Sequence, residues 1–284
     1  MRGIYQDRQD AGAVLAAEVA KVVKGSCVVA AIPRGGIVVA APVAERLKAP
    51  LTLTYTRKIA LPDAPELAVG TLDEDGEAIL DSDLIERMGA GGEEVEAARA
   101  RVRAEIERQR SLYEAPPLAP RLTGNTLVLV DDGLATGFTM RAAIRFARRH
   151  GAHEVVVAAP CASSHAARMI EREADRFICM LVDEMFLAVG SYYLEFDPVS
   201  DDEVRAVLRE AAKRERPAQP ALRSSSPSSA AHAASSSRRR VRPWSSSDWR
   251  ASVSSTLRSR SSPSVRAARS SASTRPGMAA ARVA

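Results

Sequence analysis

The chain has 284 residues, and its 40 basic and 35 acidic side chains give a formal net charge of +5 and a pI of about 9.4. The excess of positive charge comes from residues 217–284, which hold 12 Arg and 21 Ser but one acid and no Lys. Without them 28 basic and 34 acidic residues remain, a net charge of −6, which argues against a folded nucleic-acid-binding module. The first ten residues are polar and no apolar run approaches twenty residues, so we expect a cytoplasmic protein without signal peptide or membrane span.

The composition divides the chain into a folded domain, residues 1–216, and a tail, residues 217–284. The tail has almost no apolar periodicity and cannot offset the entropy of ordering, so we predict that it is disordered. Two interpretations of it stay open. It is either a basic arm that touches nucleic acid or membrane through charge, or the product of a GC-rich gene read out of frame, which the restriction to Arg, Ser, Ala and Pro favours.

Apolar periodicity predicts alternating strands and helices in the folded domain. Helices are expected at residues 11–23, 37–47, 81–88, 93–113, 138–149, 163–173 and 201–213, and strands at 27–32, 51–56, 69–72, 77–80, 127–130, 154–159 and 177–182. Residues 2–10 are expected to be a polar lead-in, 61–67 a loop rich in breakers and 73–76 a hairpin turn. The pattern predicts an α/β fold, a parallel sheet flanked by helices with ligands at the carboxyl ends of the strands.

The three cysteines lie in apolar runs and form no C-x-x-C pair, so we expect buried thiols in a reducing compartment. The four histidines show no metal-binding spacing.

The most informative stretch runs from Thr126 to Ala143 and reads TLVLVDDGLATGFTMRAA. A short apolar strand ends at two acids, and a loop with two glycines and two threonines leads into a helix. Glycines let the backbone approach a ligand, and the N–H groups that begin a helix favour an anion. Asp131 and Asp132 would repel a bare phosphate but accept hydrogen bonds from sugar hydroxyls, so the stretch is suited to a ribose 5-phosphate.

The run VDDGLATGFT, residues 130–139, resembles the phosphoribosyl-diphosphate (PRPP) binding motif of type I phosphoribosyltransferases. The resemblance implies that Asp131 and Asp132 bind the ribose hydroxyls. It also implies that the loop binds the 5-phosphate through Gly133, Leu134, Ala135, Thr136, Gly137, Phe138 and Thr139. Ala135 replaces the acid thought to take a proton from the base in the 6-oxopurine branch of the family, as in adenine-type loops.

A second loop, Pro33-Arg34-Gly35-Gly36, follows the strand predicted at 27–32. It is similar to the diphosphate-binding loop of the family, which often contains a strained non-prolyl cis peptide. The resemblance therefore assigns Arg34, Gly35 and Gly36 to the diphosphate. The cations Arg57 and Lys58, expected to close the strand at 51–56, would either cap it in solvent or face the diphosphate, and we favour the second role.

The family fold implies a small hood made from terminal segments, here about residues 183–213, over the acceptor, and a mobile loop at residues 61–67 that closes over the reaction. In residues 186–196, Tyr192, Tyr193 and Phe196 would either stack on a base or belong to a packed strand.

The reaction implied is transfer of ribose 5-phosphate from PRPP to a nitrogenous base or similar acceptor, as in nucleotide salvage, with Mg²⁺ held indirectly at Asp131 and Asp132. Those acids and Lys58 are the expected catalytic residues, and only Glu66 and Glu195 suggest themselves as a base. A PRPP or nucleotide sensor and a hydrolase of phosphorylated ribose are the alternatives. A homodimer is compatible with the family, and neither nucleic acid nor membrane is an expected partner of the folded domain.

Overall fold

The computed structural model describes residues 3–215, so the tail predicted at 217–284 lies outside the described residues. Within residues 3–215, no helix is long and apolar enough to cross a bilayer.

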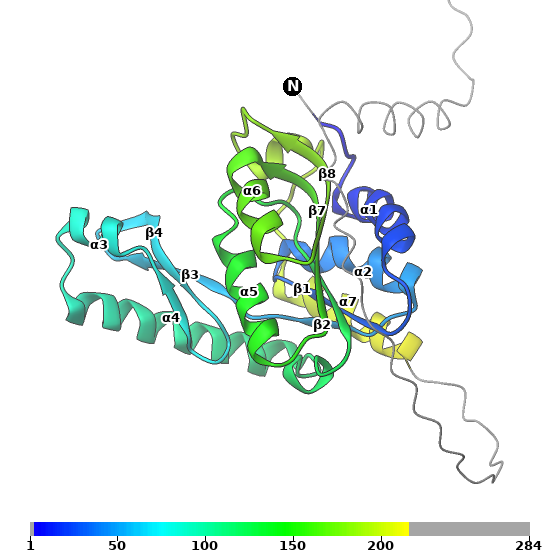
Figure 1. The fold of residues 1–284 in the computed structure, drawn as a ribbon, viewed down its shortest axis with the longest axis horizontal. Helices are drawn as coiled ribbons and strands as arrows, with labels where there is room; N and C mark the ends of the chain where they lie inside the picture. The colour runs from blue at the N-terminus through cyan, green and yellow to red at the C-terminus, as the bar shows by residue number, and fades with distance from the viewer. Residues whose placement is uncertain (1–2, 216–284) are drawn as a thin grey trace, which may run out of the picture. The chain divides into compact units, whose positions relative to one another are not determined.

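A five-stranded parallel sheet with the strand order β2-β1-β6-β7-β8 forms the centre of the fold (Figure 1). Its strands are β1 (Cys27–Ala31), β2 (Leu51–Leu53), β6 (Thr126–Val130), β7 (Glu154–Ser163) and β8 (Arg176–Asp183). β1 and β6 pair in parallel and are buried along their whole length, as strands covered on both faces must be. After β1 the chain adds β2 on one side, and after β6 it adds β7 and β8 on the other. The carboxyl ends of β1 and β6 therefore form the switch point at which α/β folds bind ligands.

Helices cover both faces of this sheet. α1 (Arg8–Val22) and α2 (Gly35–Leu47) pack together on one face, and α5 (Phe138–Arg149) and α6 (Ser164–Glu173) cover the other (Figure 1). The last described helix, α7 (Asp201–Glu215), contacts α2 and β2. The predicted α/β class with a flanked parallel sheet is thus confirmed.

Between β2 and β6 the chain inserts a second unit, residues 57–113, which we call the arm. It consists of an antiparallel sheet of β3 (Arg57–Leu61), β4 (Ala64–Leu72) and β5 (Ala78–Leu80), followed by α3 (Ser82–Met88) and α4 (Gly92–Tyr113). The hairpin predicted at residues 73–76 is confirmed, since β4 and β5 pair across it. Its turn is fastened to the end of α5, where Arg149 pairs with Asp73 and His150 Nε2 lies 2.8 Å from Asp75 Oδ2.

The predicted boundaries around the arm are wrong in two places. The strand expected at 51–56 ends at Leu53, so Arg57 and Lys58 begin β3 instead of closing β2. The loop expected at 61–67 is a turn at residues 62–63, and β4 has already begun at Ala64. Pro65 is tolerated in this strand because the register between β3 and β4 shifts there, and such bulges need no ladder hydrogen bond from the proline.

The predicted lead-in at residues 2–10 is also too long. α1 begins at Arg8, because the Asp7 side chain accepts a hydrogen bond from the Asp10 amide and caps the helix there. This shift by one turn places Arg8 on a helix that packs against the sheet, with consequences for the site.

Candidate active site

The two acids of the motif directly follow β6, at the carboxyl end of the central sheet. Asp131 Oδ1 accepts a hydrogen bond from the Asp132 amide at 2.9 Å, which fixes the first carboxylate against the backbone of the second. Burial raises the pKa of both carboxyls, and the neighbouring Asp132 charge raises that of Asp131 further. The acids therefore form a strained, desolvated pair that gains from hydrogen-bond donors or cations brought by a ligand.

The predicted diphosphate loop lies against this acid pair. The Pro33-Arg34 peptide is cis, as the family resemblance led us to expect. A Cβ atom at Gly35 would lie 1.9 Å from Asp132 Oδ2, and one at Gly36 would lie 3.1 Å from Asp131 Oδ1. Only glycine lets the two loops approach this closely, so the structure brings together two motifs that are about one hundred residues apart in sequence.

Residues 133–139 form a loop that is anchored on β7. The Leu134 amide donates to Cys161 O at 2.9 Å, and its carbonyl accepts from the Ser163 amide at 2.9 Å. The Ser163 hydroxyl donates to Ala135 O at 2.6 Å. The assignment of Leu134 to the 5-phosphate needs correction, because its N–H is used by β7 and its side chain is buried in the core. Leu134 holds the loop in place instead.

The other predicted loop residues leave donors at the start of α5. Gly137 adopts φ +77° and is the N-cap, so the chain turns there and directs the first amides of α5 into the loop. Within residues 3–215, the hydroxyls of Thr136 and Thr139 have no intramolecular partner. Gly133 is packed too tightly for a side chain, since a Cβ would lie 2.6 Å from Val189 Cγ1. The loop thus offers backbone and hydroxyl donors to an anion.

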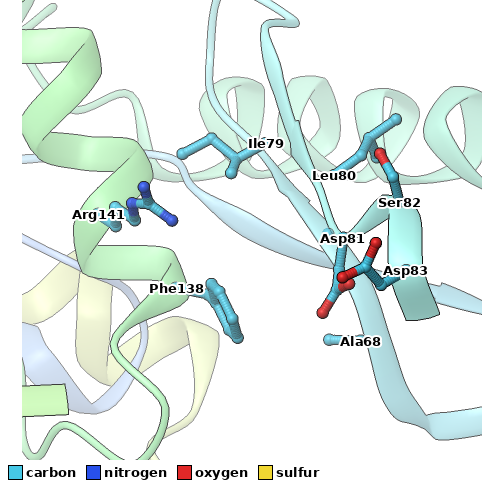
Figure 2. Close-up of a pocket in the computed structure, with 9 residues that line it drawn as sticks. Ala68, Ile79, Leu80, Asp81, Ser82, Asp83, Phe138 and Arg141 are labelled. Carbon is cyan, nitrogen blue, oxygen red and sulfur yellow. The ribbon is translucent and has the colours of Figure 1, made fainter. Parts of the chain in front are cut away.

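The Phe138 ring lines a pocket between α5 and the arm. In Figure 2 Phe138 and Arg141 project from α5 into a pocket of about 280 Å³, opposite Ala68 of β4 and Asp81 and Asp83 at the start of α3. Arg141 is held on its own side, with Nε 2.5 Å from Glu173 Oε1. The contribution of Phe138 to the anion loop is therefore limited to its backbone N–H.

The three predicted cations occupy different positions. Lys58 on β3 is exposed, and its charge opposes the rise that burial and Asp132 cause in the pKa of Asp131. Arg34 Nη1 lies 3.7 Å from Asp201 Oδ1, at the start of α7, and Arg57 Nη1 lies 3.8 Å from Glu105 Oε1 of α4. Both ion pairs are long, and both arginine side chains remain exposed across half of their surface or somewhat less. Their guanidinium groups are therefore accessible to a stronger anion.

The last turns of α4 also contact α7. Tyr113 OH donates to Asp201 Oδ1 at 2.5 Å, and Arg108 Nη1 lies 3.8 Å from Asp201 Oδ2. Asp201 therefore collects contacts from α4 and from the loop that carries Arg34. A single acid at the start of a helix gives no such signal in sequence.

Arg8 is the main residue of the site that the sequence did not predict. Its Nε lies 2.8 Å from Asp132 Oδ2, and both side chains are largely buried. Its guanidinium lies over the Phe196 ring at 3.7 Å, and Nη1 donates to Asp197 O at 2.8 Å. The aromatic run, residues 186–196, is neither a strand nor a free stacking surface. It forms a 3-10 turn, η2 (Val189–Tyr192), and then packs on this cation.

The carboxylate oxygens of the acid pair suit a hard divalent cation that is coordinated mainly by the oxygens of a bound substrate. Within residues 3–215 no group of three or more His, Cys, Asp or Glu side chains could hold a metal ion by itself. Mg²⁺ is commonly bound by one or two carboxylates together with substrate oxygens and water. Asp131 and Asp132 meet that requirement when a polyanionic substrate supplies the remaining oxygens.

A family model of the phosphoribosyl transferase domain matches residues 6–197. The chain belongs to the type I phosphoribosyltransferase family. Over 205 residues it is 38% identical to proteins of Mycobacterium tuberculosis strains CDC 1551 and H37Rv that are provisionally named phosphoribosyl transferases. The match covers 72% of this chain and 46% of theirs, so the chain spans about half the length of these curated relatives.

A solved structure agrees with the fold. The protein TT1426 from Thermus thermophilus is 39% identical, with a TM-score of 0.60, and the match covers 74% of this chain and 99% of that one. A type I phosphoribosyltransferase domain therefore extends from the start of α1 to the end of the aromatic run, and it includes every residue predicted for the site.

Proposed function

We propose that this protein transfers ribose 5-phosphate from PRPP to a nitrogenous base or similar acceptor and releases diphosphate. One observation carries the proposal. The desolvated acid pair after β6 lies between two glycine-dependent loops, one at 33–36 and one at 133–139, at the switch point of the sheet. Acceptors suited to ribose hydroxyls would then lie between two sets of donors suited to anions, which supports a ribose that carries phosphate at one end and diphosphate at the other.

The reaction breaks the bond between C1 of the ribose and the diphosphate oxygen, and forms a bond from C1 to the acceptor nitrogen, which loses its proton. Asp131 and Asp132 would accept the 2- and 3-hydroxyls, and Lys58 would stabilise the leaving group. Bound Mg²⁺ would supply charge neutralisation for the diphosphate. The described residues contribute mainly position and charge, because neither predicted base is convincing: Glu66 is exposed on β4, and Glu195 accepts from Gln6 Nε2 at 2.6 Å.

The 5-phosphate subsite consists of the α5 amides with the hydroxyls of Thr136 and Thr139. The diphosphate subsite consists of Arg34, Gly35 and Gly36, with Arg57 and Lys58 at its edge. Binding there would exchange the long Arg34 to Asp201 contact for a shorter pair with phosphate oxygens, which are strong acceptors for guanidinium groups. We propose that residues 1–216 form the transferase domain, with its hood at about 183–213, and that the protein acts in the cytoplasm.

A screen of nitrogenous bases for PRPP-dependent diphosphate release with Mg²⁺ tests the proposal. At least one base should release diphosphate with the unaltered protein, and the Asp131→Asn variant should lose that release. Because Ala135 provides no acid, hypoxanthine and guanine should be poor acceptors. Tight PRPP binding without release for any base would support the sensor, and release without an acceptor would support the hydrolase.

A further inference from the structure

The geometry around Asp132 points to a second role for its neighbours. We propose that Arg8 is a positioning residue that couples occupancy of the ribose subsite to the order of residues 189–197, which we call the Phe196 segment. The inference rests on the proposed function, since it takes Asp132 as a ribose ligand. It goes further by assigning a link between the ribose subsite and the part of the chain expected to cover the acceptor.

The contacts of Arg8 reach both sides of this link. Its Nε donates to Asp132 Oδ2, its Nη1 donates to Asp197 O, and its guanidinium plane lies on the Phe196 ring. Asp132 Oδ1 remains free of this cation, so a ribose hydroxyl can bind the carboxylate without displacing Arg8. The planar guanidinium suits such a shared position, because its donors and its face have fixed relative directions.

The position of Arg8 in α1 supports a role outside the helix. Arg8 is the first residue of α1, where a positive charge is disfavoured by the helix dipole. The helix therefore gains nothing from an arginine at this position, although the Asp132 site does. A Cβ at Gly35 would lie 2.9 Å from Arg8 Nε, so the diphosphate loop is in contact with the same pair.

The Phe196 segment also reaches Asp132 by a second route. Tyr193 OH donates to the Asp132 carbonyl at 2.6 Å, and the Tyr193 and Phe196 rings pack with centroids 4.9 Å apart. This route ends on the main chain, which a ribose hydroxyl does not touch. Of these two routes, the one through Arg8 ends on the carboxylate that a ligand would occupy, so a change at the carboxylate should reach the Phe196 segment through Arg8.

Ligand binding at the carboxylate should therefore reduce the motion of the Phe196 segment. A hydroxyl that donates to Asp132 restrains the carboxylate, which restrains Arg8 and the ring stacked on it. Ordering by a first ligand lowers the entropy cost of binding a second one. The arrangement would let PRPP prepare the acceptor side of the site before the acceptor arrives.

Hydrogen exchange of the full chain, with ribose 5-phosphate or PRPP and Mg²⁺ as probes, tests this link. In the unaltered protein the amides of residues 189–197 should exchange at least threefold more slowly when the probe is bound. Arg8→Lys keeps a cation near Asp132 but loses the planar stack and the second donor. Measured at a probe concentration that saturates each protein, Arg8→Lys should lose most of the added protection.

Two further variants separate the link from a structural effect. Phe196→Leu should lose the added protection as Arg8→Lys does, and combining the two changes should cause no further loss, because both break one route. Tyr193→Phe is the matched control. It should speed exchange of the segment with and without the probe, while the change caused by the probe stays as in the unaltered protein.

The outcomes decide between this inference and the proposed function. Equal added protection in the unaltered, Arg8→Lys and Phe196→Leu proteins would overturn the inference and leave the proposed function intact. Additive losses in the double variant would also overturn it. If the unaltered protein binds neither probe, the proposed function fails and the inference fails with it.

Discussion

Arg8 Nε lies 2.8 Å from Asp132 Oδ2, whereas its neighbour Asp131 has no ion pair within residues 3–215. The two acids of the motif are therefore not equivalent in the empty site. Asp132 has a cationic partner, whereas Asp131 accepts a hydrogen bond from the Asp132 amide and interacts with the more distant charges of Arg8 and Lys58. Their replacement by asparagine should have opposite effects on stability.

Asp131→Asn should stabilise the protein without ligand. Burial and the Asp132 charge raise the pKa of Asp131, so its contribution to stability is present at low pH and is lost as pH rises through that raised pKa. Removing the charge should therefore raise the melting temperature at pH 8, and the gain should shrink as the pH is lowered. Thermal melts at several pH values measure this, and a variant that melts lower at pH 8 would contradict the assignment of a strained pair.

Burial raises the pKa of Asp132 too, but Asp132→Asn should instead destabilise the protein, because it leaves Arg8 largely buried without its carboxylate. Breaking a fully buried ion pair costs about 3–5 kcal/mol, and the residual exposure of this pair suggests a cost on the order of 2 kcal/mol. For a domain of this size that corresponds to a fall of roughly 4–8 °C in melting temperature. Adding Arg8→Met to Asp132→Asn should restore part of the loss, which an effect unrelated to the pair would not do.

Gly35→Ala should abolish PRPP binding while the rest of the domain stays folded. The new methyl group would lie 1.9 Å from Asp132 Oδ2, so either the acid or the loop must move away. Gly92→Ala is the control, because a Cβ at Gly92 meets nothing within 4 Å. Titration of both variants with PRPP and Mg²⁺ should show binding only for Gly92→Ala. Wild-type affinity in Gly35→Ala would mean that the two loops do not form one site.

Glu74 gives the arm a dependence on pH. Its Oε1 atom is buried without a hydrogen-bond partner, and burial raises its pKa to about 7, against the opposing charge of Arg110. The stability that it contributes is full below its usual pKa and is lost as pH rises through 7. As the pH rises from 5 to 8, the free energy of unfolding of Glu74→Gln should therefore increase by on the order of 2 kcal/mol relative to that of the wild type. Parallel melting curves in that range would reject this assignment if the difference stayed constant.

The sequence predicted the site best where its pattern is local. The strand, acids, loop and helix at residues 126–149 are consecutive, so their chemistry could be read directly from residue order. The same holds for the loop at 33–36. Both lie where a parallel sheet must bring the ends of its strands together, and the switch point between β1 and β6 placed them side by side.

The parts that the sequence did not predict depend on contacts between distant segments. Arg8 meets Asp132 across 124 residues, and nothing in the polar stretch at the start of the chain distinguishes it from a solvated side chain. Asp201 likewise acquires its role only when α4 and α7 pack together. The error at Leu134 has a different origin, because the family motif does not indicate that its amide is used by β7.

Calorimetric titration of PRPP with Mg²⁺ into the unaltered protein and Asp131→Asn tests the central claim most directly. A charged hydrogen bond to a ribose hydroxyl is worth about 1.5–3 kcal/mol, so the variant should bind PRPP roughly ten- to a hundredfold more weakly, although it is at least as stable without ligand. Equal PRPP affinity in the two proteins, or no binding to the unaltered one, would contradict the assignment of this acid pair to the ribose of PRPP.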